Sequence, residues 1–143
     1  MRYPKEIEPG TEINDLVQNI DYAPTFLDLA GVEIPDEVQG RSLRPLWNQK
    51  DPEWRNSLYY HYYEYPHGWH FVNKHEGVRT DRYKLIHFYE MDQWELYDLK
   101  KDPHEMNNIY GKDSYSEVTD SLKEELKDLK TYYDVPKDLV QQQ

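Results

Sequence analysis

The sequence contains no cysteine among its 143 residues. Disulfide bonds and thiolate metal sites are therefore excluded, and the redox compartment stays undetermined. Long apolar runs are also lacking, since none approaches the ~20 residues that a membrane-spanning helix needs. Met1 is followed by Arg-Tyr-Pro-Lys rather than by a secretory leader, so we expect any export signal to lie in upstream sequence.

Basic residues are scarce. The chain has 17 Lys and Arg against 28 Asp and Glu, a formal net charge of −11, and the acidic excess is spread along its length. No segment offers a basic patch, so nucleic acid and anionic membrane surfaces are poor partners. A sulfated glycan is also an anion, and a site for one would need local Arg, Lys or His.

Aromatic residues are abundant: they make up 15% of the chain, with 14 tyrosines and 4 tryptophans, while the apolar fraction is only 37%. We predict a core built from large rings with polar tips rather than from aliphatic side chains. Ring-rich surfaces also suit sugar faces, although strand propensity explains most of these tyrosines more simply. The length fits one domain of ordinary size.

The first third of the chain predicts one clear helix, over residues 22–30. Asp21 is expected to be its N-cap, Pro24 falls in the first turn, and Gly31 stands where a left-handed residue ends a helix. The apolar residues of this helix cover more than one of its faces, so we expect another part of a protein to pack against it. Residues 16–20 are a candidate short strand, and residues 32–56 read as loop with one helical turn within 40–47.

From Ser57 the chain becomes aromatic and β-prone. We predict four antiparallel strands, with a tight turn at Asp81-Arg82 between the second and third. Their ranges are 58–65, 77–80, 83–89 and 94–99.

A helix is predicted over 115–133, because apolar residues recur there at helical spacing and Ser114 with Glu117 forms a capping-box pattern. Its apolar stripe should pack on one face of the sheet. The predicted fold class is therefore α+β, with an antiparallel sheet of about four strands packed against a C-terminal amphipathic helix.

Four of the six histidines lie close together in the sequence, at His61, His67, His70 and His75. With Glu64 and Glu76 nearby they suggest a zinc site, but gaps of six, three and five residues match no helical ligand pair. We therefore predict no metal ligands here.

A sugar-binding loop is the alternative use of this segment. Tyr65, Trp69 and Phe71 could offer ring faces to a sugar, while neighbouring histidines donate hydrogen bonds to hydroxyls or a sulfate. The same aromatics could instead cover the edge of the sheet, and composition does not decide between the two.

Arg79 and Arg82 flank the predicted tight turn. An arginine fork can bind sulfate, but an arginine near a turn pairs more often with an acid such as Glu76 or Asp98, and we favour that interpretation. No Ser-His-Asp order, glycine-rich phosphate loop or pair of catalytic carboxylates stands out. We assign no catalytic residue.

Several short motifs together resemble the C-terminal region of type I, formylglycine-dependent sulfatases, over residues 2 to about 133. These motifs are Arg2-Tyr-Pro4, Pro9-Gly-Thr11, Asn19-Ile-Asp21, Ala23-Pro-Thr25, Leu27-Asp-Leu-Ala-Gly31, Gly40-Arg-Ser-Leu43, Gly77-Val-Arg-Thr80, Tyr83-Lys84 and Glu95-Leu-Tyr-Asp-Leu99. The resemblance implies a remnant of the α/β sulfatase core in residues 1–50. It implies a smaller C-terminal subdomain in 51–136, followed by a disordered tail in 137–143.

The resemblance also implies where the chemistry lies. In this family the formylglycine, a calcium or magnesium ion and the supporting His, Lys and Arg come from upstream sequence, so this chain should hold no cofactor and hydrolyse nothing alone. Tyr60-His-Tyr-Tyr-Glu-Tyr-Pro66 and Lys84-Leu-Ile-His-Phe-Tyr89 look most like bacterial N-acetylglucosamine-6-sulfatases, which act on heparan-type or mucin glycans. In those enzymes the loop matching 65–75 faces the sugar, which makes Trp69 and His70 the first expected contacts and His75 and His67 the second.

Two hypotheses follow. In the first, the chain is the C-terminal part of a sulfatase, periplasmic or secreted as in its relatives, with a structural role and one loop lining the pocket for a sulfated glycan. In the second, it is a free-standing carbohydrate-binding or protein-interaction module. A free module would have no use for the all-round apolar helix at 22–30, which favours the first hypothesis. If nothing covers residues 13–30, self-association through them is expected.

Overall fold

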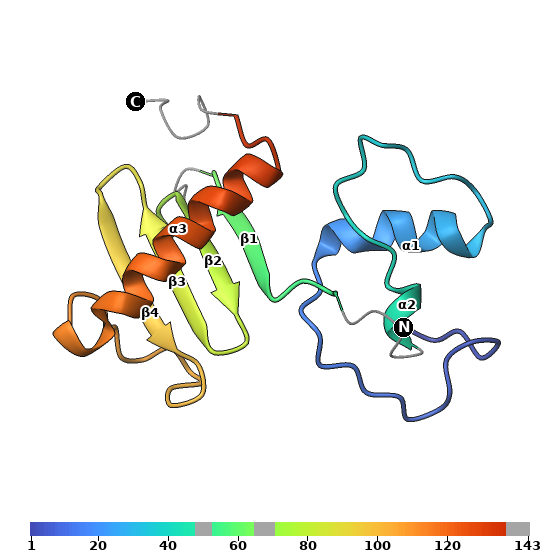
Figure 1. Ribbon diagram of the computed structural model, residues 1–143, viewed down its shortest axis with the longest axis horizontal. Coiled ribbons are helices and arrows are strands. Elements are labelled where there is room, and N and C mark those ends of the chain that lie inside the picture. Colours follow the sequence, from blue (N-terminus) through green and yellow to red (C-terminus); the bar gives the residue numbers. More distant parts are fainter. Residues whose placement is uncertain (48–52, 65–70, 137–143) are drawn as a thin grey trace. The chain divides into compact units, whose positions relative to one another are not determined.

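The computed structural model describes residues 1–47, 53–64 and 71–136, and the chain divides into two compact units, Met1–Asn56 and Ser57–Gln143 (Figure 1). Each unit has its own architecture. The predicted segments 1–50, 51–136 and 137–143 remain a prediction, and the last lies outside the described residues. No helix of the described ranges has the length and apolar character that crossing a membrane requires.

The first unit consists of short helices joined by long loops. A 3₁₀ turn η1 (Asn19–Asp21) leads into α1 (Tyr22–Leu29), and α2 (Arg44–Trp47) follows after a loop (Figure 1). Helix α1 ends as predicted, at a left-handed Gly31 with φ 68°. The Gly31 N–H bonds to the Asp28 carbonyl and the Val32 N–H to the Leu27 carbonyl, each at 3.0 Å, which satisfies carbonyls that the helix end would leave unpaired.

One prediction for this unit is wrong: residues 16–20 form no strand, because Asn19 and Ile20 already belong to η1. Asp21 is the N-cap residue of α1, as predicted, but its side chain makes no capping bond to that helix. Its carboxylate instead receives the Arg55 guanidinium and the backbone N–H groups of Gln18 and Arg41, which are stronger or better placed donors than the first turn of the helix.

The buried carboxylate of Asp21 is the hub of the first unit. Arg55 Nη2 donates to Asp21 Oδ1 at 2.7 Å and Arg55 Nη1 donates to Oδ2, while the Arg41 N–H donates to Oδ1 at 3.0 Å. Burial raises the pKa of Asp21, but these donors outweigh it and leave the pKa below its ordinary value. The carboxylate therefore stays charged and joins three segments far apart in the sequence.

Close backbone approach explains why two of the quoted motifs occur together. A Cβ at Gly40 would lie 2.0 Å from the carbonyl oxygen of Ile20, so only glycine fits there. Thr25 continues the connection, since its Oγ1 donates to the Asp21 carbonyl at 2.6 Å and accepts from the Leu43 N–H at 2.9 Å.

Arg44 forms a second polar junction in this unit. Its Nε and Nη2 each donate to the Glu6 carboxylate at 2.7 Å, and its Nη1 donates to Asp28 at 3.0 Å. Ser42 Oγ donates to the same Asp28 side chain at 2.6 Å. The N-terminal segment, α1 and α2 are thus tied together by ion pairs.

The second unit is a four-stranded antiparallel sheet with one helix on it, as the sequence predicted. Strands β1 (Ser57–Tyr62), β2 (His75–Thr80), β3 (Tyr83–Phe88) and β4 (Gln93–Asp98) pair in chain order. After the 3₁₀ turn η2 (Asp113–Tyr115), helix α3 (Ser116–Tyr132) crosses one face of the sheet (Figure 1).

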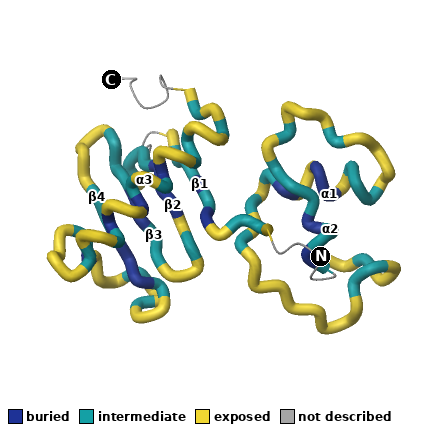
Figure 2. The backbone as a smooth tube through the Cα atoms, viewed as in Figure 1, coloured by how far each residue is buried: buried dark blue, intermediate teal, exposed yellow. Residues whose placement is uncertain are grey.

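The core lies between the sheet and α3. Val78, Leu85 and Leu96 are fully buried on facing positions of β2, β3 and β4, and Leu122 and Leu126 cover them from α3 (Figure 2). Aromatic rings surround this aliphatic centre, among them Tyr83, Trp94, Tyr110, Tyr115 and Tyr133. The predicted ring-built core is therefore wrong at its centre, although Tyr59 belongs to the buried cluster. The other rings lie at the margin, where their polar tips can reach partners.

The predicted capping box before α3 does not form. Ser114 lies inside η2, and the residue that precedes the helix is Tyr115, which makes no side-chain capping bond. Ser116 Oγ instead donates to the Asp113 carbonyl at 3.0 Å. The extra 3₁₀ turn moves the helix start two residues beyond Ser114.

Candidate functional site

His75 is the predicted sugar contact that the described residues include. It opens β2, opposite Tyr62 at the end of β1, on the face of the sheet away from α3. Its ring stacks on Tyr62 with centroids 5.4 Å apart and contacts Phe88 at 5.3 Å. Because the Asn73 carbonyl can only accept, the His75 Nδ1 that lies 2.8 Å from it carries a proton. The ring is thus fixed in both position and orientation.

His61 lies one residue before Tyr62 and therefore faces the α3 side of the sheet. Its Nε2 is 3.1 Å from Tyr89 Oη, and its ring meets Tyr63 and Tyr89 edge-on at centroid distances of 5.5 and 5.4 Å. Burial, together with the charges of Lys130 and His75, lowers the pKa of His61 despite the opposing charge of Glu76. His61 is accordingly a neutral hydrogen-bonding ring at neutral pH.

Exposed rings stand on both described sides of the loop that joins β1 to β2. Tyr63 is 66% exposed and Phe71 is 85% exposed. Trp69, His70 and His67, the other three predicted sugar contacts, lie outside the described residues. The described part of this hairpin end therefore combines the ring of His75, held by its neighbours, with the exposed rings of Tyr63 and Phe71. Exposed rings suit contact with the apolar side of a sugar.

The described residues of the hairpin end bring no group of metal ligands together. His61 and His75 lie on opposite faces of the sheet. Within residues 1–47, 53–64 and 71–136, no three His, Asp or Glu side chains are grouped closely enough to hold a metal ion.

A buried polar cluster under α3 was not predicted from the sequence. Glu76 is only 2% exposed, and it accepts hydrogen bonds from Lys130 Nζ at 2.7 Å and Tyr59 Oη at 3.1 Å. His87 Nδ1 lies 3.8 Å from the same carboxylate. Burial raises the pKa of Glu76, but these neighbours outweigh it, so the pKa is below its ordinary value and the group is charged.

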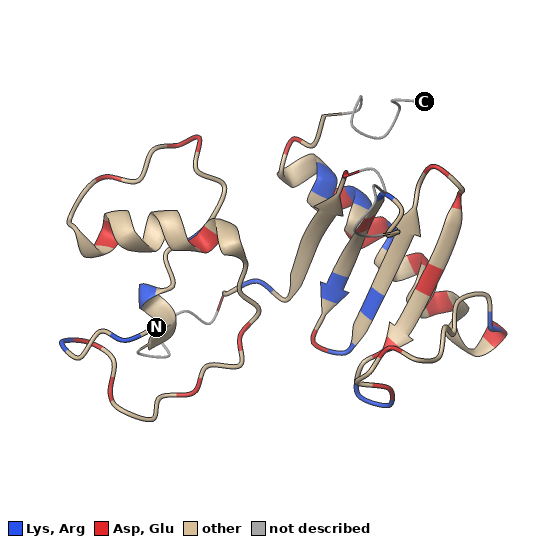
Figure 3. Ribbon diagram, turned by 180° about the vertical axis from the view of Figure 1, so that it is seen from behind, with Lys and Arg blue, Asp and Glu red and all other residues tan. Residues whose placement is uncertain are grey.

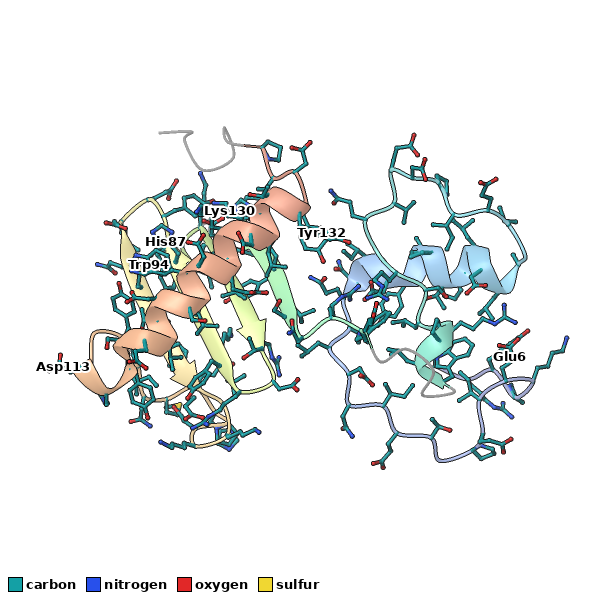
Figure 4. All side chains as sticks on the ribbon, in the orientation of Figure 1. Glu6, His87, Trp94, Asp113, Lys130 and Tyr132 are labelled. Carbon is teal, nitrogen blue, oxygen red and sulfur yellow. The ribbon has the colours of Figure 1, made fainter. Side chains whose placement is uncertain are left out.

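The same cluster continues along the sheet to Trp94 (Figure 4). The His87 and Trp94 rings stack with centroids 3.8 Å apart, and Asp92 accepts from His87 Nε2 at 3.1 Å and Trp94 Nε1 at 3.3 Å. Glu76 is thus buried and bonded to Tyr59 and Lys130 within the second unit. The cluster attaches the last turn of α3 to the sheet.

Arg82 pairs with an acid, as predicted. Its Nη2 donates to Asp98 Oδ2 at 2.9 Å, and this bond is the largest cause of the lowered pKa of Asp98. Asp102 stabilises the turn that follows β4, since its Oδ2 accepts from the Asn107 N–H at 2.7 Å. Arg82 is therefore engaged in the β-turn and not in an anion site.

A shallow hollow of about 350 Å³ lies at the other end of the sheet from His75. It is lined by Thr80, Tyr83, Glu117, Val118, Ser121 and Leu122. Glu117 is its one charged lining residue. The lining therefore offers no cationic side chain to an anionic sugar.

Comparison with known proteins identifies the class to which this fold belongs. A family model described as "N-sulphoglucosamine sulphohydrolase, C-terminal" matches residues 1–132. The chain belongs to this family and corresponds to the C-terminal region of a sulfatase.

Two curated relatives show the range of the similarity. The N-acetylglucosamine-6-O-sulfatase of Bacteroides thetaiotaomicron is 49% identical over 137 residues, which cover 93% of this chain and 24% of that protein. The delta 4,5-hexuronate-2-O-sulfatase of the same species is 36% identical over 103 residues, 69% of this chain and 20% of that protein. The chain thus spans about a quarter of the length of the first of these relatives.

The fold agrees with this relationship. A solved structure of a protein in complex with its substrate D-glucosamine-2-N,6-O-disulfate matches 99% of this chain and 29% of its own, with 45% identity and a TM-score of 0.92. The α+β subdomain and the preceding helical segment are therefore both features of the sulfatase C-terminal region.

Sulfatases of this family depend on a metal ion and a formylglycine. The sequence has no cysteine from which a formylglycine could be made, and the residues that the structure describes offer no group of metal ligands.

Proposed function

We propose that this chain forms the C-terminal part of a sulfatase that hydrolyses 6-O-sulfate esters of N-acetylglucosamine in a glycan. One observation carries the proposal: 49% identity to an N-acetylglucosamine-6-O-sulfatase extends over 93% of the chain. Identity of that level over both units supports a similar substrate pocket as well as a similar fold. The TM-score of 0.92 to a structure holding a 6-O-sulfated glucosamine supports the same substrate class.

In this proposal the chain packs against the catalytic region of the enzyme. The loop between β1 and β2 lines the sugar-binding pocket. Trp69 and His70 are the proposed first sugar contacts, with His75 and His67 second. The fixed ring of His75 supports this assignment. Its Nδ1 is bonded to Asn73, which leaves Nε2 to bond a sugar hydroxyl or, when protonated, a sulfate oxygen.

The metal ion and the formylglycine would be held by the catalytic portion of the sulfatase. The proposed partner is a sulfated glycan, and the proposed location is the periplasm or the exterior of a bacterium. We propose no nucleic acid and no anionic membrane as a partner, because the formal net charge of −11 opposes binding to polyanions. Figure 3 marks acidic and basic residues along the chain in both units.

A chimera tests the substrate assignment. The matching C-terminal quarter of the B. thetaiotaomicron N-acetylglucosamine-6-O-sulfatase is replaced by this chain, and sulfate release from 6-O-sulfated N-acetylglucosamine is measured. A matched chimera carries the corresponding region of the delta 4,5-hexuronate-2-O-sulfatase. We expect turnover with this chain and a large loss with the control. Equal loss in both chimeras would contradict the assignment.

The pocket contacts are tested in the active chimera. His75→Ala should raise KM for the sulfated sugar, whereas His104→Ala, in the second unit but far along the chain from the hairpin end, should leave it unchanged. An unchanged KM for His75→Ala, with full thermal stability, would remove His75 from the sugar site.

A further inference from the structure

The His75 ring is enclosed by aromatic rings from the two strands beside β2. Tyr62 lies opposite it on β1 and stacks on it with the ring planes 24° apart. Phe88, at the end of β3, contacts it with ring centroids 5.3 Å apart, and Tyr60 meets it edge-on at 6.0 Å. Three rings thus surround the imidazole on the face of the sheet that points away from α3.

A glycine makes room for one of these rings. Gly77 and Tyr60 are opposite each other in the register of β2 and β1, and a Cβ at Gly77 would lie 2.4 Å from Tyr60 Oη. The Tyr60 ring therefore lies over Gly77, which is possible because that residue has no side chain. The motif that begins at Gly77 thus contributes to the surroundings of His75.

The two nitrogens of the His75 ring differ in their surroundings. Nδ1 lies 2.8 Å from the Asn73 carbonyl, to which it donates. Nε2 receives no hydrogen bond from residues 1–47, 53–64 or 71–136, and it is not a side-chain atom that is buried without a partner. Nε2 is therefore open to a ligand, and in the neutral ring it accepts a hydrogen bond such as that of a sugar hydroxyl.

Phe88 supplies a restraint that the hydrogen bond of Nδ1 does not. One hydrogen bond fixes the distance of Nδ1 from the Asn73 carbonyl, but the ring can still tilt about that bond. Packing against Phe88 limits the tilt and so fixes the direction in which Nε2 points. The Phe88 side chain has no polar atom of its own, so it cannot replace His75 as a hydrogen-bonding partner of a sugar.

We propose that Phe88 is a positioning residue of the sugar site, which holds the His75 imidazole so that Nε2 meets a hydroxyl of the glycan. The inference rests on the proposed function. It adds a residue of β3, outside the loop between β1 and β2, whose effect on the substrate passes through His75. A side chain that its neighbours already hold loses less freedom on binding, so loosening it weakens binding without removing a contact to the sugar.

A double-variant cycle in the active chimera tests the inference. Phe88→Ala should raise KM for 6-O-sulfated N-acetylglucosamine about two- to tenfold, the range expected for loss of one aromatic contact, with kcat unchanged. In the His75→Ala background the same substitution should leave KM unchanged, because the ring that Phe88 holds is absent. Phe88→Tyr keeps the aromatic ring and should keep KM.

Ile86→Ala is the matched control. Ile86 lies on the same face of β3, two residues before Phe88, and is 8% exposed, so its substitution also removes buried apolar surface. We expect it to lower the melting temperature of the chimera. Any change of KM that it causes should be the same with His75 and with His75→Ala.

The isolated full chain gives a second readout that does not depend on turnover. The ¹⁵N chemical shifts of the His75 ring distinguish a proton on Nδ1 from a proton on Nε2, and the bond to Asn73 predicts Nδ1–H in the neutral ring. Phe88→Ala should produce a mixture of the two tautomers, and Phe88→Tyr should restore the single one. Ile86→Ala should keep the single tautomer, which separates positioning from general destabilisation.

The outcomes separate this inference from the substrate proposal. An equal rise of KM for Phe88→Ala with and without His75, or an unchanged tautomer in Phe88→Ala, would overturn the inference and leave the substrate assignment intact. A KM that does not respond to His75→Ala would also overturn it, since His75 would then bind no sugar. An inactive chimera would remove the substrate assignment, and the chemical shifts alone would then decide whether Phe88 orients His75.

Discussion

The two units of this chain reach a stable arrangement by different means. The second unit buries an aliphatic centre of Val78, Leu85 and Leu96 between its sheet and α3. The first unit buries a carboxylate, Asp21, at its centre and leaves the rings of Tyr22 and Phe26 in solvent. A domain that folds for itself places its apolar surface inside, so the second unit is built as a subdomain and the first as part of a larger body.

Asp21→Ala should have the largest effect, confined to the first unit. The substitution leaves the Arg55 guanidinium, whose side chain is only 10% exposed, without its carboxylate. Breaking a buried pair in this way costs about 3–5 kcal/mol of unfolding free energy. Urea unfolding followed by tryptophan fluorescence would detect the loss, and Asp36→Ala, at an exposed aspartate of the same unit, is the control. Equal stabilities of the two variants would show that Asp21 is not the hub.

Leu85→Ala should come next, and it should act on the second unit. The side chain is fully buried, so the substitution opens a cavity and lowers the unfolding free energy by about 2–5 kcal/mol. Circular dichroism during thermal unfolding measures the change. Ile13→Ala, at a residue that is 37% exposed in the first unit, should shift the transition little. A larger loss of thermal stability for Ile13→Ala than for Leu85→Ala would contradict the view that the second unit, and not the first, is held together by an apolar core.

Glu76→Gln should cost less, about 1–3 kcal/mol, and should change the pH dependence of stability. The pKa of Glu76 is lowered in the folded state, so its contribution is fully present above the ordinary glutamate pKa of about 4.3. The contribution disappears as the pH falls through the folded-state pKa. Unfolding free energies between pH 7 and pH 3 should therefore fall less steeply for Glu76→Gln than for the unsubstituted chain. Parallel curves would show that Glu76 is not charged in the fold.

Phe26→Ser should have the smallest effect on the isolated chain, within about 0.5 kcal/mol, because the ring is already in solvent. The melting temperature of the chain alone measures it. A loss comparable to that of Leu85→Ala would mean that Phe26 supports the first unit, and the contrast with the second unit would then fail.

Local patterns were sufficient to predict most of the fold. The four strands, α3 and the Gly31 end of α1 follow from alternation, helical spacing and turn residues, which act over a few positions. The errors involve partners that are distant in the sequence. Aspartate is a preferred helix-capping residue, but the side chain of Asp21 bonds to Arg55, which lies 34 positions away. Nothing near Glu76 points to Lys130, which is 54 positions away.

The candidate site was less predictable than the fold. The family resemblance predicts His75 as a sugar contact, and its ring lies against those of Tyr62 and Phe88. Trp69, His70 and His67 remain predictions because they lie outside the described residues. Composition alone did not separate a sugar-facing loop from a cover for the sheet edge, since both uses need exposed rings beside polar groups.

The most direct test of the account is the rate of sulfate release by the chimera in which this chain replaces the C-terminal quarter of the B. thetaiotaomicron N-acetylglucosamine-6-O-sulfatase. The account predicts turnover of 6-O-sulfated N-acetylglucosamine, with a KM that rises when His75 is replaced by alanine. A soluble, folded chimera that releases no sulfate from this sugar would contradict it.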